Sequence, residues 1–428
     1  MKKALILAAV AAVALSACSK NEIIETINKV PEEVAIGFSN YSPKTVTKAN
    51  STYTGTTSLA VNEKFAVMSY ATTSGNNFGT ATGTGDDQLG TQFMNMVPVK
   101  WVNNASNGAN NEYSPVRYWP AGDTPNWLTF WAYYPVVEAA AGGIAENTAA
   151  TNNGIVYTAP TGSNEVGSFS FKVADNAADM VDFMVSDVVS DKIYGTASGV
   201  DASGATYAVR GEVPLVFHHT LTRVQFYFLT DKKDSDKNTD VVLKTVNLSN
   251  VYTHGNLATA YPMTFVSSNW SGTAVESPTP IVFSVVNSTD GSFKLEEKNA
   301  QTPSKSKVDI SSGYPGTYAT SYPVNGDIYL MIPQDLTASD PVLTITYDIK
   351  TYSTTSAHAD GDLLSSSSNT ATVHLKDIFK TGSNTEKITS WDMNNIVTYT
   401  FIIGAHPIQF TASVNDWTPD IQGELNID

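Results

Sequence analysis

Alternation of apolar and polar residues predicts β-strands along most of the chain. Near the start, Val34, Ile36 and Phe38 alternate with small residues, so one face of this segment is large and apolar. Near the end, residues 408–415 alternate strictly. The apolar face of that last segment consists of Ile408, Phe410, Ala412 and Val414. Further apolar or alternating segments lie at residues 64–70, 97–101, 127–137, 155–158, 168–173, 182–189, 213–219, 223–229, 241–248, 281–286, 327–332, 342–348, 371–375 and 396–403.

The spacing of these segments predicts an all-β protein built from sandwiches. Short strands separated by Gly, Pro, Asn and Ser turns are typical of β-sandwiches, and no segment keeps a helical period for more than a few turns. A length of 428 residues suggests two or three domains. The stretch 195–211 is rich in Gly, Ser and Ala. We therefore predict one sandwich over residues 34–205 and a second over residues 206–428.

The first residues have the layout of a secretory signal peptide. Lys2 and Lys3 precede an apolar run, Ala4–Leu15, which is shorter than the roughly 20 residues that a membrane-spanning helix needs. The run ends in Leu15-Ser16-Ala17-Cys18, which resembles the lipobox of bacterial lipoproteins. We predict a signal peptide over residues 1–17.

Cys18 is the only cysteine of the chain, and it occupies the lipidation position of the lipobox. The resemblance implies that its thiol takes a diacylglycerol and its new amine an acyl chain such as palmitate. The alternative is an ordinary signal peptide followed by an incidental cysteine. Residues 18–33 are polar and are predicted to be a tether. The chain is thus expected to pass through the periplasm and to be held at the outer membrane by lipid.

The charge and cysteine content argue against nucleic-acid binding and against stabilisation by disulfides. After removal of the signal peptide, 41 acidic residues face 23 basic ones (25 less Lys2 and Lys3), a net charge of −18. Such a surface repels nucleic acid, and no basic patch stands out. Internal disulfides are impossible with one cysteine, so stability must come from packing.

Six segments carry a resemblance to a known family. They are 116–120 (Val-Arg-Tyr-Trp-Pro), 128–135, 182–185, 213–224, 329–334 and 412–417. In this order they resemble the fimbrillins, the type V pilus subunits of Bacteroidetes. The resemblance implies two transthyretin-like β-sandwich domains in tandem, export as a lipoprotein, and assembly into cell-surface fimbriae that support adhesion. It also implies that other fimbrial subunits, of this or a related kind, are the partners. The host ligand stays open.

The family assembles after proteolysis removes the first strand. Here that strand is the one containing Val34, Ile36 and Phe38, and the donor of a replacement strand is the segment containing Ile408 and Phe410. Strand addition supplies backbone hydrogen bonds, and alternate side chains fill pockets. The alternative is that both segments are ordinary structural strands of one monomer.

A cleavage site is expected just after the first strand. Lys48, or else Lys44, lies in a polar segment of the kind where proteolysis concentrates. Some members of the family are cut after arginine, but the first arginine of this chain is Arg117, inside the Tyr-Trp-Pro segment. This departure leaves the protease open, and also leaves open an uncut subunit that serves as an anchor.

Sugar binding, metal binding and catalysis have only weak support in the sequence. The aromatic residues between 118 and 134 allow a competing hypothesis, a monomeric lipoprotein that binds glycan through exposed rings, although core packing is the usual role of such residues. His218 and His219 point to opposite faces of a strand and do not indicate a metal site. The aspartates between 231 and 240, and Asp360-Gly-Asp362, lack the ligand order of a calcium loop. No catalytic motif or cofactor fingerprint is present, so we expect no enzyme activity.

Overall fold

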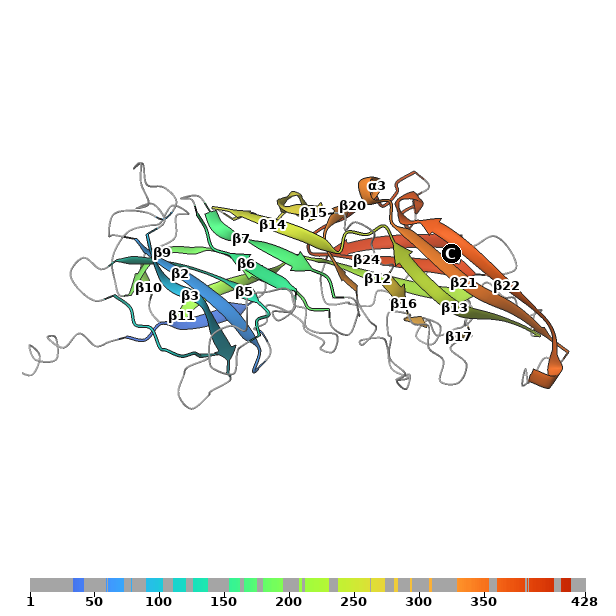
Figure 1. Cartoon of the computed structure of the whole chain (residues 1–428), viewed down its shortest axis with the longest axis horizontal. Helices are drawn as coiled ribbons and strands as arrows, with labels where there is room; N and C mark the ends of the chain where they lie inside the picture. The colour runs from blue at the N-terminus through green and yellow to red at the C-terminus, as the bar shows by residue number, and fades with distance from the viewer. Residues whose placement is uncertain are drawn as a thin grey trace, which may run out of the picture.

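The structure is a computed structural model of the whole chain, elongated, with the strands of the N-terminal half at one end and those of the C-terminal half at the other (Figure 1). The residues that it describes are 34–41, 59, 61–72, 78, 90–102, 111–120, 126–137, 154–161, 165–174, 180–194, 208–209, 212–230, 238–261, 263–273, 281–283, 293–294, 308–309, 329–353, 360–381, 383, 385–403 and 409–416.

The largest sheet has nine strands, and its main order is β1-β11-β8-β5-β2-β3-β4, with β9 paired to β5 and β10 to β9. Its strands are β1 (Gly37–Tyr41), β2 (Lys64–Thr72), β3 (Thr91–Trp101), β4 (Asn111–Glu112), β5 (Trp127–Tyr134), β8 (Met184–Ser186), β9 (Val189–Tyr194), β10 (Ala208–Val209) and β11 (Glu212–His219).

Both faces of the central strands β2 and β5 are buried. Along β5, Leu128 and Phe130 belong to one apolar cluster, whereas Trp131 and Tyr133 belong to another on the opposite face. The second face is covered by a four-stranded sheet of order β15-β14-β7-β6. Its strands are β6 (Ile155–Thr158), β7 (Glu165–Lys172), β14 (His254–Ala260) and β15 (Trp270–Thr273). The aromatic richness of the sequence segment 127–134 thus reflects burial on both sides.

The first face is enclosed because the nine-stranded sheet curls. β1 and β4 stand at opposite ends of the strand order, yet the side-chain amide of Asn111 in β4 donates to the carbonyl oxygen of Phe38 in β1 at 2.7 Å. The apolar cluster inside the curl contains residues of β1, β2, β3, β5, β8 and β11 together with Trp119. β1 is therefore the strand that closes the curl.

The C-terminal half contributes two facing sheets around one core. One has the order β18-β12-β24-β25, with β19 also paired to β12; the other has the order β16-β13-β21-β22, with β17 also paired to β13. The strands are β12 (Thr222–Thr230), β13 (Thr239–Ser249), β16 (Ile281–Phe283), β17 (Phe293–Lys294), β18 (Val308–Asp309), β19 (Tyr329–Met331), β21 (Val342–Tyr352), β22 (Leu363–His374), β24 (Asn395–Ile403) and β25 (Gln409–Asp416).

Helices are short in the described part of the chain. They are α3 (Leu336–Ser339), η4 (Ser267–Asn269), η5 (Asp360–Asp362) and η6 (Leu375–Asp377), and a small sheet pairs β20 (Gln334–Asp335) with β23 (Ser390–Trp391). Among the described residues, no helix is long and apolar enough to cross a bilayer. The prediction of an all-β protein is confirmed.

Strand pairing crosses the predicted boundary at residues 205 and 206. β11 lies after that boundary but pairs with β1 and β8 of the nine-stranded sheet. β14 pairs with β7 and so carries a segment of the second half back onto the first. The division into two domains stays a prediction.

Candidate functional site

The first strand is held between two neighbours. Residues 34–36 run antiparallel to residues 117–119, with the Ile36 N–H donating to the Arg117 carbonyl at 2.9 Å and the Trp119 N–H donating to the Val34 carbonyl at 2.9 Å. The chain then continues as β1, which runs parallel to β11 with Phe38 beside Val213. One side of the segment therefore faces residues 111–119, and the other faces β11.

The side chains of Asn111 and Tyr113, called the clamp residues below, hold the backbone of this segment by hydrogen bonds. The Tyr113 hydroxyl donates to the Ile36 carbonyl at 2.7 Å, and the Asn111 amide donates to the Phe38 carbonyl at 2.7 Å. The Tyr113 ring also lies against Phe38, with ring centroids 5.8 Å apart. This clamp could not be predicted from the sequence, because a single Tyr or Asn carries no pairing signal.

The apolar face of the segment fills the inside of the curl. Phe38 is fully buried and Ile36 is 1% exposed, whereas Val34 is half-buried at the margin of the same cluster. Phe38 meets Phe130 edge to face at a centroid distance of 5.8 Å. That this strand is removable stays a prediction.

The last strand is part of its own sheet. β25 pairs antiparallel with β24, and Ala412 is buried while Val414 packs against the main core. Residues 379–381 contact its outer edge, since the Thr381 N–H donates to the Ala412 carbonyl at 2.7 Å. To act as a donor, β25 must therefore leave both neighbours. Ile408 lies outside the described residues, and of Phe410 only the backbone is described.

The other predicted positions of processing and anchoring lie outside the described part of the chain. They are the signal peptide 1–17, Cys18, the tether 18–33, Lys44 and Lys48. Each stays a prediction.

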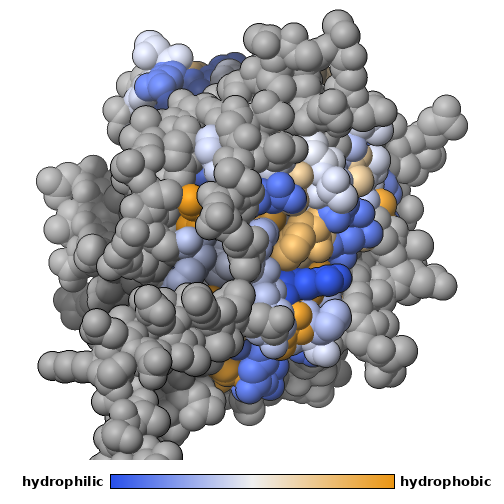
Figure 2. All heavy atoms as spheres, turned by 90° about the vertical axis from the view of Figure 1, so that its left-hand side faces the viewer, coloured by the Kyte–Doolittle hydropathy of each residue, from blue (hydrophilic) through white to orange (hydrophobic). Residues whose placement is uncertain are grey.

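The aromatic residues between 118 and 134 pack in the cores. Trp119, Phe130, Trp131, Tyr133 and Tyr134 are buried, while Tyr118 is 44% exposed. At the end of the molecule that carries β9 and β10, hydrophilic and hydrophobic residues interleave where described residues reach the surface (Figure 2). These rings do not form a flat stacking surface for a sugar, since most of them are buried and not accessible to a ligand.

The two histidines each bind a carboxylate. His219 Nδ1 lies 3.0 Å from Asp182 Oδ1 in a buried pair, and His218 Nε2 lies 2.9 Å from Asp187 Oδ1. Neighbouring residues of β11 point to opposite faces, so the two pairs are separate. Within the described ranges, no group of three or more metal-ligating side chains is found.

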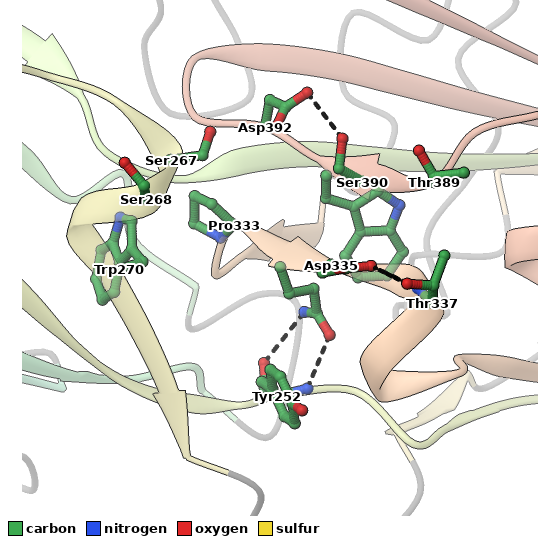
Figure 3. A pocket seen from close by; sticks show the side chains of 12 residues that line it. Tyr252, Ser267, Ser268, Trp270, Pro333, Asp335, Thr337, Thr389, Ser390 and Asp392 are labelled. Atoms are coloured by element: carbon green, nitrogen blue, oxygen red, sulfur yellow. Dashed lines mark hydrogen bonds between the residues drawn. The ribbon is translucent and has the colours of Figure 1, made fainter.

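A cavity of about 660 Å³ lies where η4, β20 and β23 meet (Figure 3). Its polar side chains serve local structure. The Asp335 carboxylate accepts hydrogen bonds from the Thr337 hydroxyl and from the Thr337 N–H, the latter at 2.7 Å. These two bonds hold the pKa of the Asp335 carboxyl below its ordinary value. The indole N–H of Trp391 donates to the Tyr399 hydroxyl at 2.9 Å. The cavity therefore gives no indication of a particular ligand.

Comparison with known families identifies the chain. The model of a family described as fimbrillin-like matches residues 47–417. The chain belongs to the fimbrillin-like family. The resemblance inferred from the sequence is thus confirmed, and the match includes the clamp residues and β25 but begins after β1.

Solved structures resemble this fimbrillin-like chain at low sequence identity. A fimbrial protein from Bacteroides vulgatus ATCC 8482 is similar with a TM-score of 0.53 and 17% identity, over 90% of this chain and 99% of that one. A fimbrilin from Porphyromonas gingivalis W83 has a TM-score of 0.38 and 11% identity, over 91% and 99%. The tip fimbrial protein Mfa3 from P. gingivalis, with a C-terminal truncation, has a TM-score of 0.33 and 8% identity, over 90% and 100%. The B. vulgatus similarity supports the fold. No curated protein sequence matches significantly.

Proposed function

We propose that this fimbrillin-like chain is a structural subunit of bacterial surface fimbriae, assembled by protease-triggered strand exchange. In this proposal it is exported as a lipoprotein anchored through Cys18. The observation that supports it most is the closing position of β1, whose Phe38 is buried between β11 and the clamp residues. A strand in this position leaves an open groove when it departs.

The energetics favour a replacement strand. Burial of a large apolar side chain is worth about 1.5–3 kcal/mol, so loss of Ile36 and Phe38 removes about 3–6 kcal/mol before hydrogen bonds are counted. A whole domain is stable by only about 5–15 kcal/mol. The emptied groove also leaves backbone groups of β11 and of residues 117–119 without their strand partner. A replacement strand with alternating apolar residues would fill the emptied pockets and would restore the backbone hydrogen bonds.

The proposed order of events follows from the chain. The uncut subunit fills its own groove, so it does not polymerise during transit through the periplasm. Cleavage after Lys48, or after Lys44, separates the first strand from the rest of the chain. The incoming strand presents Ile408, Phe410, Ala412 and Val414. Before it can enter the groove of another subunit, this donor strand must separate from β24 and from Thr381 of its own chain.

Limited trypsin digestion of the purified precursor tests this proposal. We expect heat-resistant ladders on gels after digestion, and monomers when both Lys44 and Lys48 are replaced by alanine. Lys387→Ala is the matched control, because Lys387 is exposed and lies far along the chain. If the first strand is lost and the wild type stays monomeric at high concentration, self-polymerisation is wrong, and an anchor role takes its place.

A further inference from the structure

Among the described strands, none pairs with the outer edge of the twelve-residue strand β22. β22 is the last strand in the order β16-β13-β21-β22. Every second residue of an antiparallel edge strand directs its N–H and C=O outward. β22 therefore offers a row of backbone donors and acceptors to a second strand, and the Ser367 carbonyl among them accepts from the Asn369 side-chain amide at 3.0 Å.

This edge is accessible. Residues 363–368 are exposed on both faces of the sheet, and Leu364 is 67% exposed, the most of any large apolar side chain in the described chain. β21 and β22 extend together to the end of the molecule opposite β9 and β10 (Figure 1). A second chain can therefore approach β22 without displacing the core.

Natural edge strands normally carry features that block pairing, such as charges, proline or short length. Residues 363–373 contain no charged residue and no proline. A bulge at Leu364, where Tyr352 pairs with Leu363 and Thr351 with Ser365, lies at one end and leaves Ser365–His374 in regular pairing. Other edges are short, as β4 and β6 are, or are contacted from outside, as β25 is. Among the edge strands described, β22 alone is both long and without a described contact from another segment along its outer side.

The sequence of β22 is complementary to itself in one antiparallel register. With Ser368 opposite Ser368 of a second copy, Ser366 faces Thr370 within the regularly paired stretch Ser365–His374. Thr and Ser are favourable cross-strand partners. In an antiparallel pair related by a two-fold axis perpendicular to the sheet, facing residues must direct their side chains to the same face of the sheet. The register about Ser368 satisfies this requirement, because even-numbered residues then face even-numbered ones and odd-numbered residues face odd-numbered ones.

The ends of the strand match in charge in the same register. Asp360 and Asp362 precede β22, whereas His374 and Lys376 stand at its other end. Each acidic end thus lies toward the end of the second copy that carries His374 and Lys376. Lys376 Nζ and His374 Nδ1 already bind Asp340 at 3.2 and 2.9 Å, so their heads are held beside the strand end. Exposed pairs of this kind are worth about 0–1 kcal/mol, so they select the register more than they drive association.

We propose that β22 is a docking edge for β22 of a second copy of this chain, paired antiparallel about Ser368. The pairing is isologous and closes on itself, so it joins subunits in pairs side by side and does not build a fibre. It requires neither cleavage near Lys48 nor release of β25. It therefore stands apart from the assembly proposed above.

Cross-linking tests the register. In the full chain with Cys18→Ser, the introduced thiol is the only one. We expect Ser368→Cys to form disulfide-linked dimers under mild oxidation, because directly opposed Cβ atoms of such pairs lie about 4.5–5.5 Å apart. Ser366→Cys alone should stay unlinked, whereas a mixture of Ser366→Cys and Thr370→Cys chains should cross-link.

Sedimentation tests the association itself. The uncut chain should dimerise with rising concentration, and Ser368→Lys should abolish the dimer because two like charges then stand opposite each other. Ser271→Lys on the exposed edge strand β15 is the control and should leave the dimer intact. A chain that stays monomeric at its highest soluble concentration overturns the proposal, as does a dimer that Ser368→Lys leaves unchanged.

Discussion

The Tyr113 hydroxyl lies 2.7 Å from the Ile36 carbonyl oxygen and donates a hydrogen bond to it across 77 residues of sequence. The same hydroxyl accepts from the Arg117 N–H at 3.3 Å, and the Ile36 N–H donates to the Arg117 carbonyl at 2.9 Å. Tyr113 thus links the first strand to the segment that faces it. In the proposed strand exchange, release of the first strand would have to break this small group of bonds.

Removal of the Tyr113 hydroxyl should loosen the first strand. We expect Tyr113→Phe to lower the free energy of unfolding by about 0.5–1.5 kcal/mol, the usual net worth of one hydrogen bond. After trypsin digestion, the cut first strand should also exchange faster with a labelled peptide of residues 34–41. Tyr118→Phe is the control, because Tyr118 is 44% exposed. Equal exchange rates in the two variants would contradict a clamping role.

Alkaline pH should weaken the same clamp. Burial raises the pKa of the Tyr113 phenol, and burial likewise raises the pKa values of Tyr70 and Tyr134. A raised pKa means that the folded state holds the proton more tightly, so this contribution is complete below about pH 10 and is lost as pH rises through the raised values. Denaturant unfolding should show falling stability above pH 10, with a smaller fall in Tyr113→Phe. An unchanged fall would exclude Tyr113 as a contributor.

Truncation of Phe38 should destabilise the N-terminal sheet strongly. Phe38 is fully buried and packs against Phe130 and Tyr113, so Phe38→Ala leaves a cavity. Such changes cost about 3–5 kcal/mol. Tyr118→Ala, at an exposed aromatic position, should change stability by much less. Chemical denaturation measures both, and a similar small loss in each would show that β1 is not integral to the curl.

A charge in the last strand should block assembly after cleavage. Phe410→Asp would place an uncompensated carboxylate in an apolar groove, which is strongly unfavourable. We expect this variant to be cleaved by trypsin at the wild-type rate yet to form no ladder. Ser413→Asp, on the polar face of the same strand, should form ladders. Ladders from Phe410→Asp would exclude this segment as the donor.

Lipidation at Cys18 is tested by metabolic labelling. A clickable fatty acid should label the wild type and not Cys18→Ala, because the chain has no other cysteine for a thioether-linked lipid. Cell fractionation should then find the unlabelled variant outside the outer membrane fraction. Labelling of both chains to the same extent would refute the lipobox interpretation.

Local patterns in the sequence determined the strand content and the buried faces. Alternation along residues 34–38 identified the face of Ile36 and Phe38, because side-chain direction in a strand has a period of two whatever the partner. The fimbrillin resemblance followed from short aromatic and apolar segments, which the family match over residues 47–417 confirms. Both are properties of contiguous residues.

Only the tertiary structure decided which segments meet. β11 pairs with β1 across the predicted boundary at 205/206, and no local pattern reports the partner of a strand. Local alternation likewise predicts a strand at 371–375 but none at Ser365–Ser368, where a run of serines shows no alternation. Pairing with β21 makes that run a strand, and the curl of the nine-stranded sheet brings Tyr113 to Ile36. Backbone hydrogen bonds to a distant partner supply what local propensity lacks.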